Sequence, residues 1–355
     1  MLYRNLHLND QAIAAYRQTI EKYPATEEAY TALDALQALY VESGNVDEYL
    51  AYSKNLTKIN MNVTTAEDSL LYAAAEMQYM QAAYQKATVS LNNYLTQYCA
   101  GGRYCTVARY YLADSYYRLG KTSEALAQYT VLAEMNANPY QEEAATRVAE
   151  ICYDKGDWKG ALDGFYRMHA LASTRENITI ARLGILRCSQ QLGRHQAAID
   201  IAEQLLSDTP VSEDTKAEAL YGRAKAYVSM GQWSKAQPDL QTLAKEVRTP
   251  QGAEAKYLLA QSYYEAKDLD AAEAQVMEFT QMNTQQQYWL ARALLLLSDI
   301  NRSRGEYFQA RQYLLVLQQN YLVKGDDIPA LINARLAELD KLEQPEEKEE
   351  TEYEE

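Results

Sequence analysis

Residues 104–139 read YCTVARYYLADSYYRLGKTSEALAQYTVLAEMNANP, and the spacing within this stretch decides the fold. Gly120 lies near its middle, and Ala125 follows five residues later. Glycine ends a helix at low cost in the left-handed conformation, and a small residue in the next helix lets two helix backbones approach closely. The stretch therefore predicts two antiparallel helices joined by a tight turn.

The same spacing recurs along the chain. Alanines return at steps of 36 to 38 residues, at Ala87, Ala125, Ala161, Ala198, Ala236, Ala272 and Ala310. A glycine precedes most of them by five residues, at Gly120, Gly156, Gly193, Gly231 and Gly305, while Ala82 and Lys267 take this place in two repeats. A fixed period of this length marks a repeat protein in which each unit packs on its neighbours. We expect an all-α solenoid of stacked antiparallel helix hairpins.

The repeat resembles the tetratricopeptide repeat (TPR). In residues 104–139 the resemblance rests on Leu112, Ala113, Tyr116, Gly120, Ala125, Tyr129, Leu132 and Pro139, and residues 250–284 repeat it at Leu259, Ala260, Tyr263 and Ala272. The period of 36 to 38 residues exceeds the usual 34 and is similar to that of long-repeat proteins of the bacterial cell envelope. The resemblance implies a right-handed TPR superhelix with a concave groove that binds a protein or peptide.

The alanine frame also predicts the domain organisation. Eight helix pairs are expected near residues 30–60, 68–98, 104–136, 142–172, 177–208, 215–247, 252–283 and 288–321. Residues 9–23 have the pattern of a second helix alone, so the chain is expected to begin in mid-repeat, as a fragment of a larger bacterial protein. We expect one solenoid over residues 1–326, a capping helix at 327–343 and a disordered acidic tail at 344–355.

Charge and hydropathy restrict the classes of partner that the chain is expected to bind. The net charge is −15, of which the last 13 residues supply −7, and no basic stripe is present to neutralise phosphates, which argues against nucleic acid. The strongest apolar run, WLARALLLL at 289–297, is too short to cross a bilayer, so no direct membrane insertion is expected. The resemblance favours the periplasm or cell envelope, with the cytoplasm as the alternative.

The sequence gives no pattern typical of an enzyme. Gly101 and Gly102 lack the Lys and Ser or Thr of a phosphate-binding loop. His7, His169 and His195 lie in different repeats, whereas zinc needs four ligands together, so we expect neither a metal site nor a cofactor. We predict that the chain is not an enzyme; the alternative is a non-catalytic regulatory arm of a larger one.

Four cysteines divide into two kinds. Cys152 and Cys188 have the spacing of buried thiols in first helices. Cys99 and Cys105 flank AGGRY between two repeats, and this loop allows them to join as a disulfide in an oxidising compartment or to remain as two free thiols.

Tyrosine lines the expected groove. In the TPR frame, the inward-facing positions carry Tyr72, Tyr79, Tyr110, Tyr117, Tyr153, Tyr221, Tyr257 and Tyr264. Arg187 and Lys225 are the basic residues expected in the C-terminal half of the same groove. Tyrosine offers a large contact area and a hydroxyl that bonds to peptide groups. Two interpretations stay open: a partner-binding surface, or rings that support the neighbouring repeat.

We therefore hypothesise a protein-interaction scaffold that binds a peptide or protein in a tyrosine-lined groove. The alternative of another class is a structural module that self-associates through its N-terminal edge, where half a repeat leaves an apolar face open.

Overall fold

The computed structural model describes residues 2–56, 59, 61, 67–99, 103–208 and 210–343. Within these residues the chain forms nineteen α-helices and no strand. The predicted fold class, an all-α solenoid of stacked antiparallel hairpins, is confirmed. The tail expected at 344–355 lies outside the described residues.

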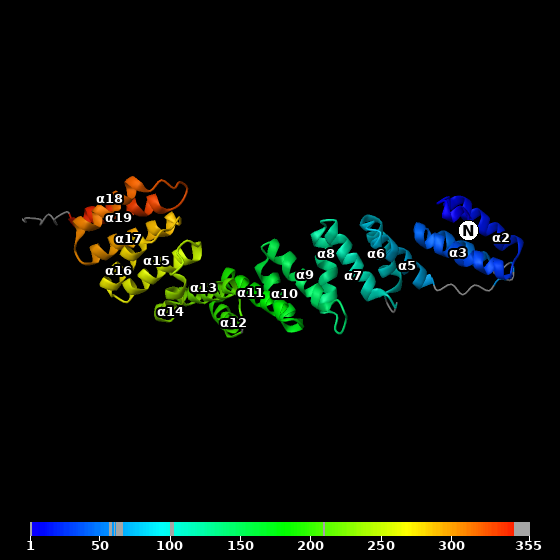
Figure 1. Cartoon of the computed structure of the whole chain (residues 1–355), viewed down its shortest axis with the longest axis horizontal. Helices are drawn as coiled ribbons and strands as arrows, with labels where there is room; N and C mark the ends of the chain where they lie inside the picture. The colour runs from blue at the N-terminus through cyan, green and yellow to red at the C-terminus, as the bar shows by residue number, and fades with distance from the viewer. Residues whose placement is uncertain are drawn as a thin grey trace, which may run out of the picture. The chain divides into compact units, whose positions relative to one another are not determined.

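The chain divides into two compact units, residues 1–178 and 179–355, here called the N-terminal and C-terminal units. The N-terminal unit contains α1 (Leu2–Asn5), α2 (Asn9–Lys22), α3 (Glu27–Ser43), α4 (Val46–Leu56), α5 (Glu67–Met80), α6 (Tyr84–Tyr98), α7 (Cys105–Arg118), α8 (Thr122–Glu134), α9 (Gln141–Asp154) and α10 (Trp158–Leu171). Within it, α5 to α10 follow one another as hairpins, each helix packed on the next (Figure 1).

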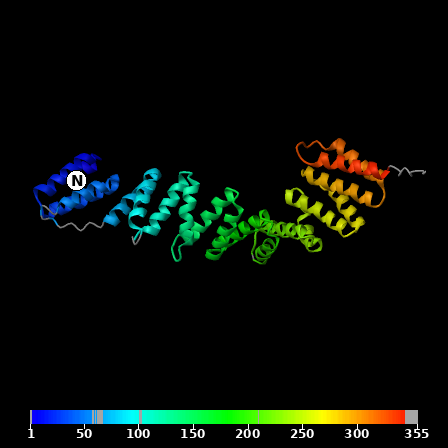
Figure 2. The same cartoon turned by 180° about the vertical axis from the view of Figure 1, so that it is seen from behind.

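The boundary between the units falls within α11 (Arg175–Gln191). The C-terminal unit continues with α12 (His195–Ser207), α13 (Glu213–Ser229), α14 (Trp233–Leu243), α15 (Pro250–Glu265), α16 (Leu269–Gln281), α17 (Gln287–Ser303), α18 (Tyr307–Asn320) and α19 (Ile328–Glu343). Its hairpins α15–α16 and α17–α18 pack on each other (Figure 2). One continuous solenoid over residues 1–326 stays a prediction.

The turns between paired helices share one backbone conformation. Gly120 and Gly231 have φ of 71° and 69°, which glycine adopts without a steric penalty. Ala82 and Lys267 occupy the same place with φ of 58° and 64°, although their Cβ atoms make this conformation costly. Gly44, with φ of 75°, forms the corresponding turn within the helix pair predicted near residues 30–60, where Tyr49 takes the place of the alanine.

Small residues bring the helices of a hairpin together. Ala125 and Ala161 are fully buried. In α10, a Cβ added to Gly164 would lie 2.9 Å from both the Cα and the backbone nitrogen of Ala149 in α9. Two backbones therefore meet with no room for even a methyl group, which explains why small residues recur on second helices.

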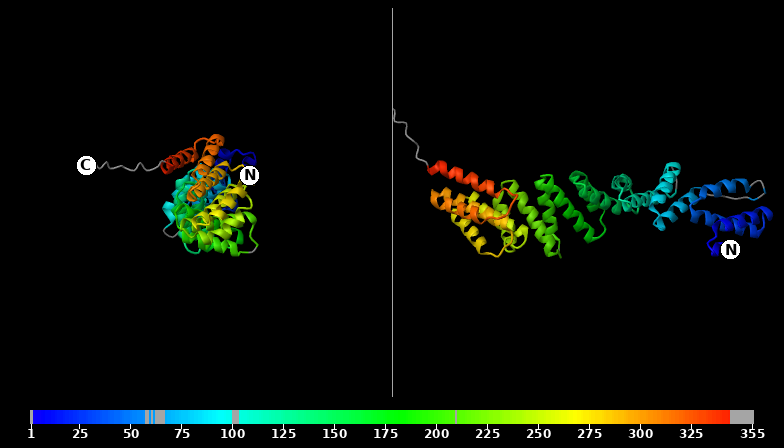
Figure 3. Two further views of the ribbon diagram at one scale, coloured as in Figure 1. Left: turned by 90° about the vertical axis from the view of Figure 1, so that its left-hand side faces the viewer. Right: turned by 90° about the horizontal axis from the view of Figure 1, so that it is seen from above.

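The last helix covers the end of the C-terminal unit. In α19, Ile332 and Leu339 are buried against α17 and α18, and Figure 3 shows this red helix lying along the orange pair. A helix in this place removes the apolar edge that a final repeat would otherwise expose. Among the described residues, no helix is both long and apolar enough to cross a membrane.

A disulfide joins Cys99, the C-cap of α6, to Cys105, the first residue of α7. Their Cα atoms are 5.5 Å apart, within the usual range for such a bond. The two remaining thiols, Cys152 and Cys188, are free and buried, and burial raises the pKa of Cys188 to about 11.

Replacing Ala161 with leucine should lower the free energy of unfolding by about 1–3 kcal/mol, because the larger side chain cannot fit between packed helices. Chemical denaturation monitored by circular dichroism measures the change. Ala170→Leu, at an exposed position of the same helix, is the matched control. Equal stability of the two variants would contradict the close packing.

Alkylation of the denatured, unreduced protein should label two of the four cysteines, and alkylation after reduction should label all four. Intact mass spectrometry counts the labels. Four labels before reduction, in protein purified without reductant from an oxidising compartment, would show that the Cys99–Cys105 bond does not form there.

Candidate functional site

The eight tyrosines expected along the groove lie on the first helices of hairpins. They come from α5, α7 and α9 in the N-terminal unit and from α13 and α15 in the C-terminal unit. Tyr72 and Tyr257 are buried, each 7% exposed, whereas Tyr117 is 36% exposed. The others are half-buried, so most of their surface faces protein.

Half of these rings stack on an aromatic ring at the next first helix or at its N-cap. The pairs and their centroid separations are Tyr72 with Tyr104 (4.4 Å), Tyr79 with Tyr111 (4.3 Å), Tyr110 with Tyr140 (4.2 Å) and Tyr257 with Trp289 (5.7 Å). Stacked aromatic pairs stabilise a contact by about 0.5–1.5 kcal/mol beyond the area they bury. These rings join successive repeats.

The tyrosine hydroxyls are directed to the next repeat as well. Tyr79 donates to Asp114 (2.7 Å), Tyr110 to Glu143 (3.0 Å) and Tyr221 to Glu254 (2.6 Å). Each acceptor lies 33 or 35 residues later, on the following first helix. We call this set of bonds between successive first helices the polar ladder.

The remaining tyrosines also have partners within the chain. Tyr72 donates to Glu76 of its own helix (2.7 Å), and the Arg147 guanidinium lies 4.9 Å from the Tyr117 ring centroid. Tyr153 makes an edge-to-face contact with Trp158 at 5.2 Å. Tyr264 shares a hydrogen bond with Ser303 of α17 (3.1 Å). Each predicted tyrosine thus has a contact within the chain, and binding of a partner by these rings stays a prediction.

The two predicted basic residues are paired within the C-terminal unit. Arg187 donates from two nitrogens to the two carboxylate oxygens of Glu218 (2.5 and 2.8 Å), which joins α11 to α13. Lys225 donates to Glu254, the carboxylate that also accepts from Tyr221. A partner would therefore compete with internal acids for these cations.

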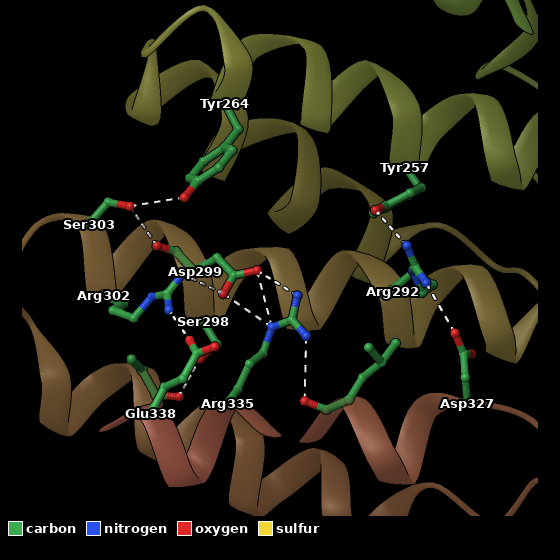
Figure 4. A network of polar contacts seen from close by, with 12 residues as sticks. Tyr257, Tyr264, Arg292, Ser298, Asp299, Arg302, Ser303, Asp327, Arg335 and Glu338 are labelled. Carbon is green, nitrogen blue, oxygen red and sulfur yellow. Dashed lines mark hydrogen bonds and ion pairs between the residues drawn. The ribbon is translucent and has the colours of Figure 1, made fainter. Parts of the chain in front are cut away.

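The polar ladder continues to the capping helix (Figure 4). Arg292 of α17 donates to the Tyr257 hydroxyl (3.2 Å) and pairs with Asp327 (3.4 Å). Arg335 of α19 donates to both oxygens of Asp299, the shortest contact being 2.8 Å. Successive first helices and the cap are thus linked by charge-assisted hydrogen bonds, which are stronger than neutral ones.

A cleft of about 770 Å³ opens in the C-terminal unit between α11, α13 and the junction of α14 with α15. Its lining residues are Arg187, Gln190, Glu213, Asp214, Lys216, Ala217, Glu218, Leu220, Tyr221, Thr242, Leu243, Glu246, Thr249 and Gln251. Two predicted site residues, Arg187 and Tyr221, belong to this set. The other eight do not line it.

The cleft wall at the start of α15 depends on a tight chain reversal. Thr249 caps the helix by accepting from the Gly252 amide (3.0 Å), and Pro250 occupies the first turn. A Cβ on Gly252 would lie 2.0 Å from the Glu246 carbonyl oxygen, so only glycine fits. The capping bond and the close approach together define the backbone path of this wall.

Sequence reasoning missed most of this cleft because its lining includes residues outside the inward positions of first helices, among them four from α14 and the α14–α15 loop. The TPR frame directs attention to inward positions of first helices, whereas Leu243 is the last residue of a second helix and Glu246 lies in the loop after it. The short helix α14 and the TPQG sequence at 249–252 were the available signals.

Two further predictions concern metal binding and self-association. No group of three or more His, Cys, Asp or Glu side chains among the described residues is arranged to hold a metal ion. At the N-terminal edge, Leu2, Leu6 and Leu8 are exposed, while Ala12 and Ile20 are buried. Self-association through this edge stays a prediction.

Comparison with known proteins identifies the repeat. The family model described as tetratricopeptide repeat matches residues 110–178, within the N-terminal unit, and residues 221–278, within the C-terminal unit. The chain contains tetratricopeptide repeats. Repeats of this type build extended surfaces that act as scaffolds for protein interaction. A search of curated proteins found no match.

Several solved structures are similar to this TPR protein. A tetratricopeptide repeat protein from Parabacteroides merdae is 19% identical, with 80% of this chain and 99% of that chain covered and a TM-score of 0.31. The C-terminal part of a TPR repeat-containing protein from Cytophaga hutchinsonii is 15% identical, with 72% and 97% covered and a TM-score of 0.47. The TPR2AB domain of yeast Sti1, in complex with pHSP90, is 16% identical, with 78% and 96% covered and a TM-score of 0.33.

High pH should destabilise this TPR protein through its buried tyrosines. Burial raises the pKa of Tyr49 from 10.0 to about 12, and its hydroxyl donates to Gln37 (3.0 Å). Since the pKa is raised on folding, the neutral phenol stabilises the fold fully below pH 10, and this contribution is lost between about pH 10 and about pH 12.

Denaturant unfolding measured across this window should show a loss for this tyrosine of about 1.4 kcal/mol per pH unit at most. Tyr49→Phe has no hydroxyl to ionise, so its stability should fall less steeply with pH. Parallel pH profiles for the wild type and this variant would contradict the assignment to Tyr49.

Proposed function

We propose that this TPR protein holds an extended peptide segment of a protein partner in the cleft of its C-terminal unit. The observation that carries the proposal is the cleft itself, whose volume of about 770 Å³ lies within the range of roughly 300–1,000 Å³ usual for ligand sites. The predicted groove residues Arg187 and Tyr221 are part of its lining.

The chemistry of the lining supports a peptide ligand. Leu220 and Leu243 are 9% and 8% exposed, so they offer an apolar floor. Gln190 and Gln251 add side-chain amides at the edges, which can both donate to and accept from a peptide backbone. An apolar floor with polar groups at its rim is typical of sites that bind a chain segment.

The cleft is also preorganised. The Arg187–Glu218 pair fixes α11 against α13, and the Thr249 cap fixes the beginning of α15. Walls that are already ordered lose little conformational entropy when a ligand binds, which favours affinity. The tyrosines of the polar ladder then act as supports that hold the binding surface in shape.

Panning a displayed library of random linear peptides against the immobilised full chain tests this function. Ala217 is an exposed residue of α13 in the cleft lining, and its replacement by tryptophan should fill the cleft. We expect enriched peptides to bind Ala217→Trp at least about tenfold more weakly than the wild type, a difference of about 1.4 kcal/mol.

The matched control is Ala337→Trp, at an exposed alanine of α19 outside the cleft, which should bind the peptides as the wild type does. Circular dichroism should show both variants folded. Failure to enrich any peptide, or equal binding of the enriched peptides by Ala217→Trp, would overturn the function.

A further inference from the structure

We propose that the cleft selects a cationic, aliphatic segment: an extended peptide in which lysine or arginine stands beside leucine, isoleucine or valine. This inference rests on the proposed function and names the chemical class of the partner. It is carried by the distribution of charge around the apolar floor.

Carboxylates outnumber cations in the lining. Glu213, Asp214, Glu218 and Glu246 line it against Arg187 and Lys216. Glu246 is held by Arg248 outside the lining (2.6 and 2.7 Å), so Asp214 is the carboxylate left in excess. A cleft with one sign of charge in excess over low-dielectric walls concentrates the opposite charge within it. The net charge of −15 on the whole chain acts in the same direction.

The two cations are poorly placed to hold an acidic ligand. Both oxygens of Glu218 engage Arg187 in a forked pair, so a ligand carboxylate would have to displace an internal one. Lys216 lies 3.9 Å from Glu213, which already provides it with a counter-charge. The cleft thus gives a ligand carboxylate no cation without an internal acid beside it.

The acids at the start of α13 are placed differently. Asp214 has no ion pair or hydrogen bond to its side chain among the described residues, and Glu213 makes only the long contact to Lys216. Both are exposed and line the end of the cleft. An arginine or lysine side chain of a bound segment would find the unpaired carboxylate of Asp214 there, with Glu213 and its long contact to Lys216 beside it.

The apolar floor explains why the bound segment should also carry an aliphatic residue. Leu220 lies two turns along α13 from Glu213, and Leu243 faces it from α14. An aliphatic side chain seated on these leucines places a neighbouring basic residue within reach of the acids. The acids at the start of α13 set the orientation of such a segment in the cleft, and apolar burial provides its affinity.

Fluorescence anisotropy with three labelled synthetic peptides on the full chain tests this class of partner. The first peptide alternates leucine with arginine, the second has glutamate for arginine, and the third has serine for leucine. We expect the leucine–arginine peptide to bind, and each of the others to bind at least about tenfold more weakly.

Neutralising the two acids at the start of α13 with Glu213→Gln and Asp214→Asn together should weaken binding of the leucine–arginine peptide about three- to tenfold, and raised salt should reduce this difference. The matched control is Glu27→Gln with Glu28→Gln, two acids that follow a capping threonine in the first turn of α3 as the pair in α13 follows Ser212. Thermal melting of both variants separates binding from helix stability.

The outcomes separate this inference from the proposed function. If the cleft-dependent peptides from the library are acidic or uncharged, or if both acid pairs weaken the arginine peptide equally, the assigned chemistry is wrong while a peptide-binding cleft stands. If the arginine peptide binds Ala217→Trp as tightly as the wild type, its site lies elsewhere and the inference is overturned. If no library peptide depends on the cleft, the proposed function itself fails.

Discussion

The close approach of paired helices is the constraint on which the rest of the structure depends. A single helix hairpin cannot cover its own apolar faces, so each must pack on the next. Gly164 leaves no room for a Cβ against Ala149, and Ala161 is fully buried beside it in the same helix. Since successive hairpins within each unit pack on one another, a larger side chain here would displace the polar groups of the N-terminal unit that depend on this spacing.

The polar ladder fixes the relative position of neighbouring first helices, which apolar burial alone leaves unspecified. Each hydroxyl–carboxylate bond between first helices contributes modestly, roughly 1.5–3 kcal/mol because one partner is charged, yet it is satisfied at one relative position of the helices. Tyr221 shows the consequence: its hydroxyl reaches Glu254 of the next first helix, and its ring is left at the wall of the cleft. The tyrosine rings thus form part of the protein surface, while their hydroxyls are already engaged in hydrogen bonds within the chain.

We therefore expect a partner to bind where the polar ladder leaves an open cleft. In the C-terminal unit, the junction of α14 and α15 turns sharply at Gly252, and the hollow beside it is large enough for several side chains. Arg187 and Glu218 form a charge pair in this lining, whereas Asp214 is unpaired and Glu213 makes only a long contact to Lys216. The proposed partner class follows from this asymmetry of charge and not from the family resemblance.

The sequence by itself determined the architecture: the period of small residues and turn glycines predicted the hairpins and the all-α class, because the spacing rules for close helix packing are local. The apolar face of residues 327–343 predicted the capping helix. The sequence also placed tyrosine on first helices. Only the tertiary structure decided what those tyrosines do, since the acceptor of Tyr110 lies 33 residues away. The same holds for the cleft, whose lining comes from four helices and whose Gly252 turn has no counterpart in the repeat pattern. Contacts between repeats depend on how helices are placed in space, which a residue's position within its own repeat does not specify.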